Sequence, residues 1–366
     1  MNKIFEPLTG KQSVFGLSGM QHQRQRQLMM PPFHGDRMRT YAETIAQVTE
    51  EIMSRWQVGQ SFCARTSTQA ITLRVIMQAV FGLYHGPRAQ QLEKLLGEML
   101  DQASSPWSVT LFYFPSLQKD LGAWSPWGRF LGFREQVDKI IYEEIRERRQ
   151  NFDPSRTDIL NLLMAARDEA GDAMTDQELR DELMTLLSAG HETTATALAW
   201  ALYWIHKIPE VQEKLLAELD SLGENPDSNA IFKLPYLNAV YCETLRIYPV
   251  AMLTFPRVVK EPLTLGGYNL KPNTVLMGSI YLTHRREDLY PEAEKFKPER
   301  FLERQYSPYE FLPFGAGARR CIGLAFAQFE MKMVLAKILS RFDLELADNT
   351  EIKAVRRGLV TAPNRS

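Results

Sequence analysis

The feature that most constrains the fold is a long apolar helical pattern between Thr175 and Lys207. Thr175 and Glu178 match the capping-box pattern that starts helices, and Pro209 ends the pattern because proline cannot continue a helix. At a rise of about 1.5 Å per residue, this helix is about 50 Å long. We therefore expect it to cross the whole molecule.

The segments before this helix are also predicted to be helical. Apolar residues recur at helical spacing in 35–55, 66–82, 87–102 and 128–149. Residues 103–127 break that spacing and are rich in aromatic residues, proline and serine. Their composition favours a mobile loop or lid, and an ordinary surface connection explains it equally well.

The last third of the chain no longer shows the helical spacing of the preceding segments. Residues 251–281 alternate and carry turn dipeptides, which predicts a small β-region, whereas residues 286–320 are irregular and rich in proline and charge. A final helix is expected from about Cys321 to Ser340, followed by a short β-like tail. The predicted fold class is therefore mainly α with a minor β region.

The composition narrows the kinds of partner and location. The 366 residues are 45% hydrophobic, enough for a large core, and 43 basic against 44 acidic side chains give no reason to expect a nucleic-acid partner. Three cysteines cannot form a dense disulfide framework, so we expect a reducing, cytoplasmic location. The longest apolar run, 195–205, is too short to span a bilayer, so no integral membrane segment is expected.

The segment Phe314–Gly323 surrounds a lone cysteine with glycines and arginines. A cysteine at the start of a helix has its thiol pKa lowered by the helix dipole, and Arg319 and Arg320 add positive charge near Cys321. Gly323 leaves room for a flat ligand against the first turn. These features predict a thiolate facing a large planar partner, although a cysteine considered alone is more often a buried structural one.

Polar residues interrupt the long helix at Ala189–Thr194. Thr193 is able to bond back to a carbonyl three or four residues earlier, which loosens the helix locally. Glu192 places an acid beside that hydroxyl, whereas His191 is expected to be structural. A solvent-facing polar turn is an equally good interpretation of the segment considered alone.

Two further spacings place charged residues on one helix face. Glu243 and Arg246 are three apart, and His22 and Arg26 are four apart. In isolation each pattern favours an exposed, weakly interacting pair or a solvated basic face.

Considered together, these motifs resemble the cytochrome P450 superfamily. The pattern Phe314-x-x-Gly-x-Arg-x-Cys-x-Gly matches that family's haem-binding loop at every fixed position. The resemblance implies haem b (iron protoporphyrin IX) with Cys321 as its axial ligand, and a cytochrome P450 fold with a long central helix. The segment at Ala189–Thr194 resembles the family's oxygen-binding motif, in which Thr193 and Glu192 would help to deliver protons.

The resemblance also assigns supporting roles. Residues that would bind the haem propionates are His22, Arg26, Arg257 and Arg319, with His22 standing where tryptophan is commoner. A buried structural triad would form from Glu243, Arg246 and Arg300.

The implied activity is that of a haem-dependent monooxygenase that hydroxylates a lipophilic substrate with O2. The sequence is similar to a bacterial branch near fatty-acid and alkane hydroxylases, so a long-chain fatty acid is the first expectation and a terpene the second. The residues expected to line the pocket are mostly apolar; they are Leu186, Ala189, Val250 to Thr254, and Val360 to Ala362.

Electrons would come from a separate ferredoxin and its reductase, since the sequence contains no flavin or iron–sulfur module. The basic residues Arg24, Arg320 and Lys332 are candidates to face an acidic partner, with ordinary solvation as the alternative. A monomer is expected. The rival readings are a peroxide-driven enzyme, a non-catalytic haem-binding protein and a cysteine hydrolase that uses Cys321.

Family members normally carry a sizeable N-terminal part before the helix that contains His22. We therefore expect residues 1–366 to form a single cytochrome P450 domain lacking the usual N-terminal helices and part of the β-sheet, and to bind haem poorly on their own.

Overall fold

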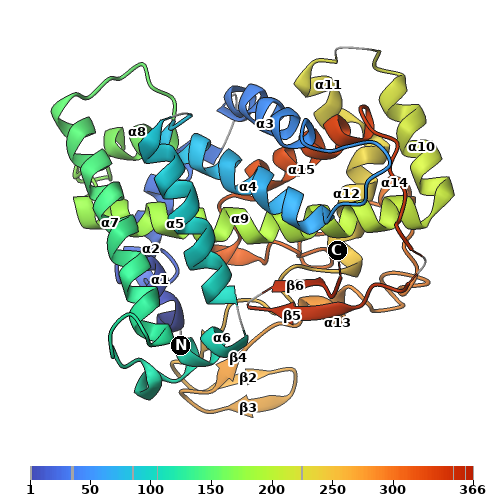
Figure 1. The fold of residues 1–366 in the computed structure, drawn as a ribbon. Coiled ribbons are helices and arrows are strands. Elements are labelled where there is room, and N and C mark those ends of the chain that lie inside the picture. The colour runs from blue at the N-terminus through green and yellow to red at the C-terminus, as the bar shows by residue number, and fades with distance from the viewer. Residues whose placement is uncertain are drawn as a thin grey trace.

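The long central helix is the axis of the computed structural model. The structure describes residues 2–33, 37–84, 86–104, 106–223, 226–348, 350–358 and 360–365. Helix α9 (Asp176–Lys207) crosses the whole molecule, as predicted (Figure 1). Its capping box is formed: Glu178 N donates to Thr175 Oγ1 at 3.2 Å, and Thr175 N donates to Glu178 Oε2 at 2.8 Å.

Helices surround α9 on several sides. Those that precede it are α1 (Glu6–Thr9), α2 (Gly19–Met29), α3 (Arg37–Met53), α4 (Ala64–Phe81), α5 (Pro87–Ser104), α6 (Pro106–Tyr113), α7 (Pro126–Gln150) and α8 (Ile159–Ala165). Those that follow it are α10 (Pro209–Asp220), α11 (Ser228–Lys233), α12 (Pro235–Ile247), α13 (Ile280–Thr283), α14 (Arg300–Glu303) and α15 (Leu324–Leu339). Short 3₁₀ turns lie at Asn2–Phe5, Pro31–Phe33, Pro115–Leu117 and Gly317–Arg319.

Helix α4 packs most closely against α9. The two helices approach closely at Gly190, where an added Cβ would lie 2.9 Å from Ile76 Cδ1. A side chain at this position would therefore push the two helices apart. This close approach brings the polar residues of α4 against the polar segment of α9.

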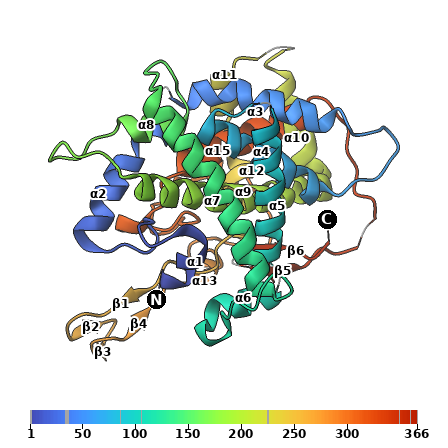
Figure 2. The same cartoon turned by 60° about the vertical axis from the view of Figure 1, so that its left-hand side comes forward.

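The strands form three small antiparallel pairs, of which β5–β6 packs against α9. They are β1 (Arg257–Val258) with β4 (Val275–Leu276), β2 (Leu263–Leu265) with β3 (Tyr268–Leu270), and β5 (Ala354–Arg357) with β6 (Val360–Pro363). Figure 2 shows β1 to β4 projecting from the lower edge of the helical body. The fold class predicted from the sequence, mainly α with a minor β region, is confirmed.

One predicted connection is helical. Helices α3, α4, α5 and α7 match the predicted helical segments to within a few residues, but α6 lies inside the predicted loop 103–127. Phe112 of α6 packs against Trp127 and Phe130 of α7, with ring centroids 5.8 and 5.3 Å apart. The prediction of a single loop is therefore wrong, because these aromatic side chains form a packing face. Residue 105 of this segment lies outside the described residues.

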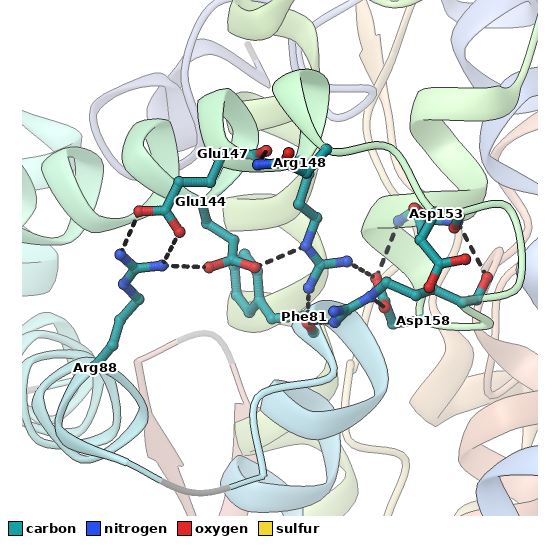
Figure 3. Close-up of polar contacts among 10 residues, drawn as sticks. Phe81, Arg88, Glu144, Glu147, Arg148, Asp153 and Asp158 are labelled. Atoms are coloured by element: carbon teal, nitrogen blue, oxygen red, sulfur yellow. Dashed lines mark hydrogen bonds and ion pairs between the residues drawn. The ribbon is translucent and has the colours of Figure 1, made fainter.

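A chain of buried charges ties the end of α7 to its neighbours (Figure 3). Arg148 lies 2.7 Å from Glu144 and 2.5 Å from Asp158, and it donates to Phe81 O at the end of α4. Arg88, at the start of α5, contacts Glu144 at 2.8 Å. Because each charge has a partner, the network offsets its desolvation cost and joins α4, α5, α7 and α8 at one corner.

Candidate cofactor site

Cys321 lies in a tight loop between the 3₁₀ turn Gly317–Arg319 and α15. Gly315 and Gly317 have positive φ angles of 69° and 65°, a conformation that favours glycine. Cys321 N donates to Phe314 O at 2.9 Å, which closes the loop. The side chain of Cys321 is exposed, so the loop presents its sulfur to a ligand.

The electrostatics of Cys321 differ from the prediction. Although the side chain faces open space, loss of solvation by the surrounding protein raises the pKa of the thiol, and the Gly323 N–H, Arg26 and Arg320 only partly offset it. The predicted lowering is therefore wrong for the protein alone. One reason is that α15 begins at Leu324, three residues after Cys321 and not at it. A metal bound to the sulfur deprotonates such a thiol outright.

Four basic side chains converge beside this loop. His22 and Arg26 come from α2, Arg257 from β1, and Arg319 from the residues before Cys321. The pKa of His22 is lowered to about 4 by burial and by the positive charges of Arg319, Arg26 and Arg257. The effect of all three guanidinium groups on one imidazole shows that the structure brings the four residues together.

The three arginines donate to main-chain carbonyls. Arg26 donates to Arg320 O at 2.6 Å, Arg257 to Phe255 O at 3.0 Å, and Arg319 to the carbonyls of Val14 and Leu17. Within the described ranges, no carboxylate forms an ion pair with any of them. The pKa of Arg319 is lowered by burial and then by the charges of Arg257 and Arg26, so the cluster is electrostatically uncompensated.

This donor set fits haem. Two propionates would neutralise the cluster through charge-assisted hydrogen bonds. Arg26 belongs to the cluster and also interacts electrostatically with Cys321, which places the sulfur and the cationic residues at one site. An exposed sulfur beside uncompensated positive charge is what an iron porphyrin with two carboxylates requires.

The polar segment of α9 points its side chains in different directions. Thr193 Oγ1 donates to Ala189 O at 2.5 Å, the back-bond that the sequence predicted. Glu192 forms an ion pair with Arg65 of α4 and accepts a hydrogen bond from Gln69 Nε2 at 2.8 Å. Because these contacts fix the segment against α4, the alternative of a solvent-facing turn is wrong.

His191 is held in the same contact between helices. It is buried, its Nδ1 lies 3.1 Å from Thr72 Oγ1, and burial lowers its pKa to about 4. The hydroxyl of Thr72 also donates to His191 O at 3.0 Å, and that of Thr68 to Ala195 O at 3.1 Å. The structural role expected for His191 agrees with these contacts.

Sequence reasoning missed the α4 residues that reach α9. Arg65, Thr68, Gln69 and Thr72 are spaced three and four apart, so they form one polar stripe on α4. The available signal for these residues was that they form a polar stripe on α4 beside a run of buried residues. It did not reveal a partner, because the pattern of one helix does not show which helix packs against it.

The predicted structural triad is assembled and buried. Arg246 Nε and Nη2 lie 2.7 and 2.8 Å from the Glu243 carboxylate, and Arg300 Nε lies 3.2 Å from it. Arg246 also donates to three carbonyls, those of His284, Ala293 and Lys295. The triad therefore joins α12 to the irregular segment that precedes the Cys321 loop.

Two of the three residues expected to face an electron donor are engaged elsewhere. Lys332 is only 2% exposed, because its ammonium group donates to Phe232 O at 2.8 Å. Arg24 pairs with Asp168 at 2.5 Å and Glu178 at 2.7 Å. Arg320 is exposed. The prediction for Lys332 is wrong, since a side chain inside the core cannot contact a partner.

The predicted pocket residues are only partly accessible. Leu253 is 47% exposed and Ala189 is half-buried, whereas Leu186 is buried. In β6, Val360 and Ala362 are also buried. Strand β6 packs against α9, where Trp200 Nε1 donates to Thr361 O at 3.0 Å.

The fold and this site define a haem-thiolate protein. The family model for cytochrome P450 matches residues 2–366, and the chain belongs to the cytochrome P450 family. It is a cytochrome P450 monooxygenase, with haem bound through a cysteine thiolate as its cofactor. No described helix is long and apolar enough to cross a membrane.

The chain is similar to curated and solved members of that family. It is 35% identical to cytochrome P450 135B1 of Mycobacterium tuberculosis over 100% of this chain and 75% of that protein. It is 34% identical to cytochrome P450 138 of the same organism over 97% of this chain and 77% of that protein.

Two solved structures share the fold. One is a cyanobacterial cytochrome P450, CYP120A1, bound to retinoic acid, with a TM-score of 0.84 and 25% identity over 98% of this chain and 80% of that one. The other is the haem domain of cytochrome P450DA, with a TM-score of 0.85 and 24% identity over 99% and 80%. The predicted family and fold are confirmed.

Proposed function

We propose that this monooxygenase hydroxylates a long-chain fatty acid with O2, using electrons from a separate ferredoxin and its reductase. The observation that carries the oxidising role is the exposed Cys321 sulfur beside four convergent basic residues. The apolar residues Leu186, Ala189 and Leu253 support a lipophilic substrate. The related structure that contains retinoic acid, an apolar chain with a carboxylate, supports the same class.

The residues of the Cys321 loop would hold the cofactor. Cys321 Sγ would bind the iron, and the cluster of His22, Arg26, Arg257 and Arg319 would bind the propionates. Haem with a thiolate ligand supplies the chemistry that cleaves O2 and inserts one oxygen atom into a C–H bond. The triad of Glu243, Arg246 and Arg300 is structural, since it holds the chain segments on which this loop is built.

Proton delivery is assigned to the polar segment of α9. Thr193 Oγ1 would donate a proton into the site and regain one from the side of Glu192. The back-bond to Ala189 O holds Thr193 Oγ1 against the backbone of α9, and the hydroxyl would turn its single proton away from that carbonyl to donate into the site. The presence of both an acid, Glu192, and an alcohol, Thr193, favours a reaction driven by electron donors over one driven by peroxide.

Thr193→Ala should uncouple oxygen use from hydroxylation. Without the hydroxyl, a proton is no longer delivered at a fixed point, so product per oxygen consumed should fall about tenfold or more while hydrogen peroxide release rises. The measurement is oxygen, peroxide and product with hexadecanoic acid and a surrogate ferredoxin system. Thr194→Ala, one residue along and on a different helix face, is the matched control. Unchanged coupling in Thr193→Ala would remove Thr193 from the proton path.

The substrate proposal predicts a preference among probes of similar size. Hexadecanoic acid should shift the haem absorption spectrum with a midpoint in the range of about 1 μM to 1 mM and should give a hydroxylated product by mass spectrometry. Hexadecane and a sesquiterpene are the comparisons. Turnover of the sesquiterpene without turnover of the acid would replace the fatty acid by the second candidate, a terpene, which the isoprenoid chain of retinoic acid also resembles.

The organisation of the whole protein is part of the proposal. We infer a single cytochrome P450 domain, since helices from both halves of the described residues pack on α9. We also propose a monomer in the cytoplasm that meets its electron donor through exposed basic residues such as Arg320.

A further inference from the structure

The β5–β6 hairpin ends in two arginines that have no acidic partner among the described residues. Arg356 and Arg357 are the last residues of β5, before the turn that leads into β6. Arg365, by contrast, lies 3.6 Å from the Asp348 carboxylate. The Nε of Arg356 donates to Gly358 O at 3.0 Å, which leaves its two outer nitrogens for other groups. The exposed Arg356 guanidinium is therefore a positive charge without a described counter-charge.

The side chain that meets this guanidinium is a phenol from a distant helix. Arg356 Nη2 donates to Tyr113 Oη at 3.5 Å, and Arg356 Cζ lies 5.9 Å from the centroid of the Tyr113 ring. Tyr113 is the last residue of α6 and is 51% exposed. Because Tyr113 Oη accepts in this contact, its own proton is available to another acceptor. The pair thus offers N–H and O–H donors side by side, a combination that suits a carboxylate.

The register of the hairpin explains why Arg356, and not Arg357, takes part. Arg356 pairs with Thr361 and Arg357 with Val360, so the two arginines point to opposite faces of the two-stranded sheet. Arg357 is half-buried, and its Nη2 donates to Asn364 O at 3.4 Å. Arg356 is on the face that reaches α6, which lies next to the hairpin in Figure 1.

Both elements that carry this pair lead back to the segment expected to line the substrate pocket. On the hairpin side, Thr361 N donates to Val250 O at 3.0 Å. On the other side, α6 contacts the turn Asn2–Phe5, and the Phe5 ring packs on the Phe255 ring with centroids 6.0 Å apart. The arginine–tyrosine pair therefore closes a ring of contacts whose opposite side is the chain from Val250 to Phe255.

We propose that Arg356 and Tyr113 form the subsite that binds the carboxylate of the substrate. This rests on the long-chain fatty acid proposed above. The outer nitrogens of Arg356 pair with the carboxylate, and the Tyr113 hydroxyl donates to the same group. With the carboxylate held here, the apolar chain runs toward residues 250–254 and α9. The carbon atoms that reach Cys321 then belong to the half of the chain remote from the carboxylate, and hydroxylation occurs in that half.

Binding of two probes separates the carboxylate from the apolar chain. Hexadecanoic acid and hexadecanol share the chain, but the alcohol carries no charge. In calorimetric titrations of the haem-loaded protein, Arg356→Gln should weaken binding of the acid about tenfold, as expected for a lost hydrogen bond to a charged group, and change that of the alcohol less than about twofold. Arg356→Lys should recover part of the loss, because it keeps the charge without the planar fork.

A second variant tests the other half of the subsite. Tyr113→Phe removes the hydroxyl and keeps the ring, so it should also weaken binding of the acid and leave binding of the alcohol unchanged. It keeps the experiment informative if Arg356→Gln does not fold.

The matched control is Lys353→Gln, which removes another exposed cation just before β5. The described hydrogen bonds of Lys353 to Asn364 come from its main chain, so the substitution preserves them. This variant should bind both probes as the native protein does. Mass spectrometry of the products gives a further readout, since the position of the hydroxyl group should spread along the chain in Arg356→Gln and stay in the remote half in Lys353→Gln.

The outcomes separate the failure of this subsite from the failure of the proposed function. Equal weakening of acid and alcohol in Arg356→Gln, or unchanged binding of the acid, would overturn the carboxylate subsite while fatty-acid hydroxylation stands. Hydroxylation by the native protein next to the carboxyl group would do the same. If the native protein neither binds nor hydroxylates hexadecanoic acid, the fatty-acid proposal falls, and this inference falls with it.

Discussion

Replacing Cys321 by serine should abolish thiolate ligation and reduce hydroxylation at least about 100-fold, which corresponds to about 2.7 kcal/mol of activation free energy. A serine hydroxyl is far less acidic than a thiol and does not donate electron density to iron as a thiolate does. The reduced, carbon-monoxide-bound protein should lose the shifted Soret band that marks a thiolate ligand. Haem content should be measured in parallel, because the cationic cluster remains in this variant.

The control for Cys321→Ser is Cys63→Ser. Cys63 lies at the start of α4, where its sulfur accepts from Thr66 N at 3.4 Å, outside the loop of Cys321. This variant should keep the shifted band. A thiolate spectrum that persists in Cys321→Ser would refute the assignment of the axial ligand, and a loss of the band in both variants would indicate that the spectrum reports general unfolding.

The second large effect is expected at the structural triad. Glu243→Gln removes the negative charge between Arg246 and Arg300, both of which are buried. Breaking one partner of a buried charge network costs about 3–5 kcal/mol, since the remaining charges lose their compensation. The free energy of unfolding of the haem-free protein in urea should fall by that amount. Haem incorporation should fall with it, because the triad supports the segment before the Cys321 loop.

An exposed ion pair provides the comparison. Asp288→Asn breaks the ion pair between Asp288 and Arg286, whose exposed fractions are 62% for Asp288 and 57% for Arg286. Because both side chains are exposed, the change should leave the urea midpoint of unfolding unchanged. Arg300→Lys is a milder change within the triad and keeps the experiment informative if Glu243→Gln does not fold. A loss below about 1 kcal/mol in Glu243→Gln would contradict the structural role of the triad.

The sequence predicted elements whose signals are local. The capping box and the helical periodicity located α9 to within one residue at its start, because both depend on residues at most four apart. The pattern around Cys321 identified the family because it combines loop glycines, arginines and the cysteine at set spacings. Thr193 was correctly expected to bond back along its own helix, which is also a local contact.

The failed predictions depended on contacts between distant segments. Phe112 stabilises α6 only because Trp127 and Phe130 of another helix lie beside it. Lys332 is buried because Phe232 supplies a carbonyl acceptor and an aromatic ring 4.4 Å from its ammonium group. Composition predicted a loop where α6 lies and a surface charge at Lys332. It could not do better, because it contains no information on the distant residues that pack against Phe112 and Lys332.

By itself, the sequence determined the helical class, the central helix, the candidate iron ligand and the residues that surround it. Only the tertiary structure decided the charge environment of Cys321, where loss of solvation outweighs the favourable charges of Arg26 and Arg320. It likewise decided the direction of Glu192, whose partners are more than 100 residues away in the chain. Solvation and ion pairing depend on every atom nearby in space, whereas helix periodicity and capping depend on neighbours along the chain.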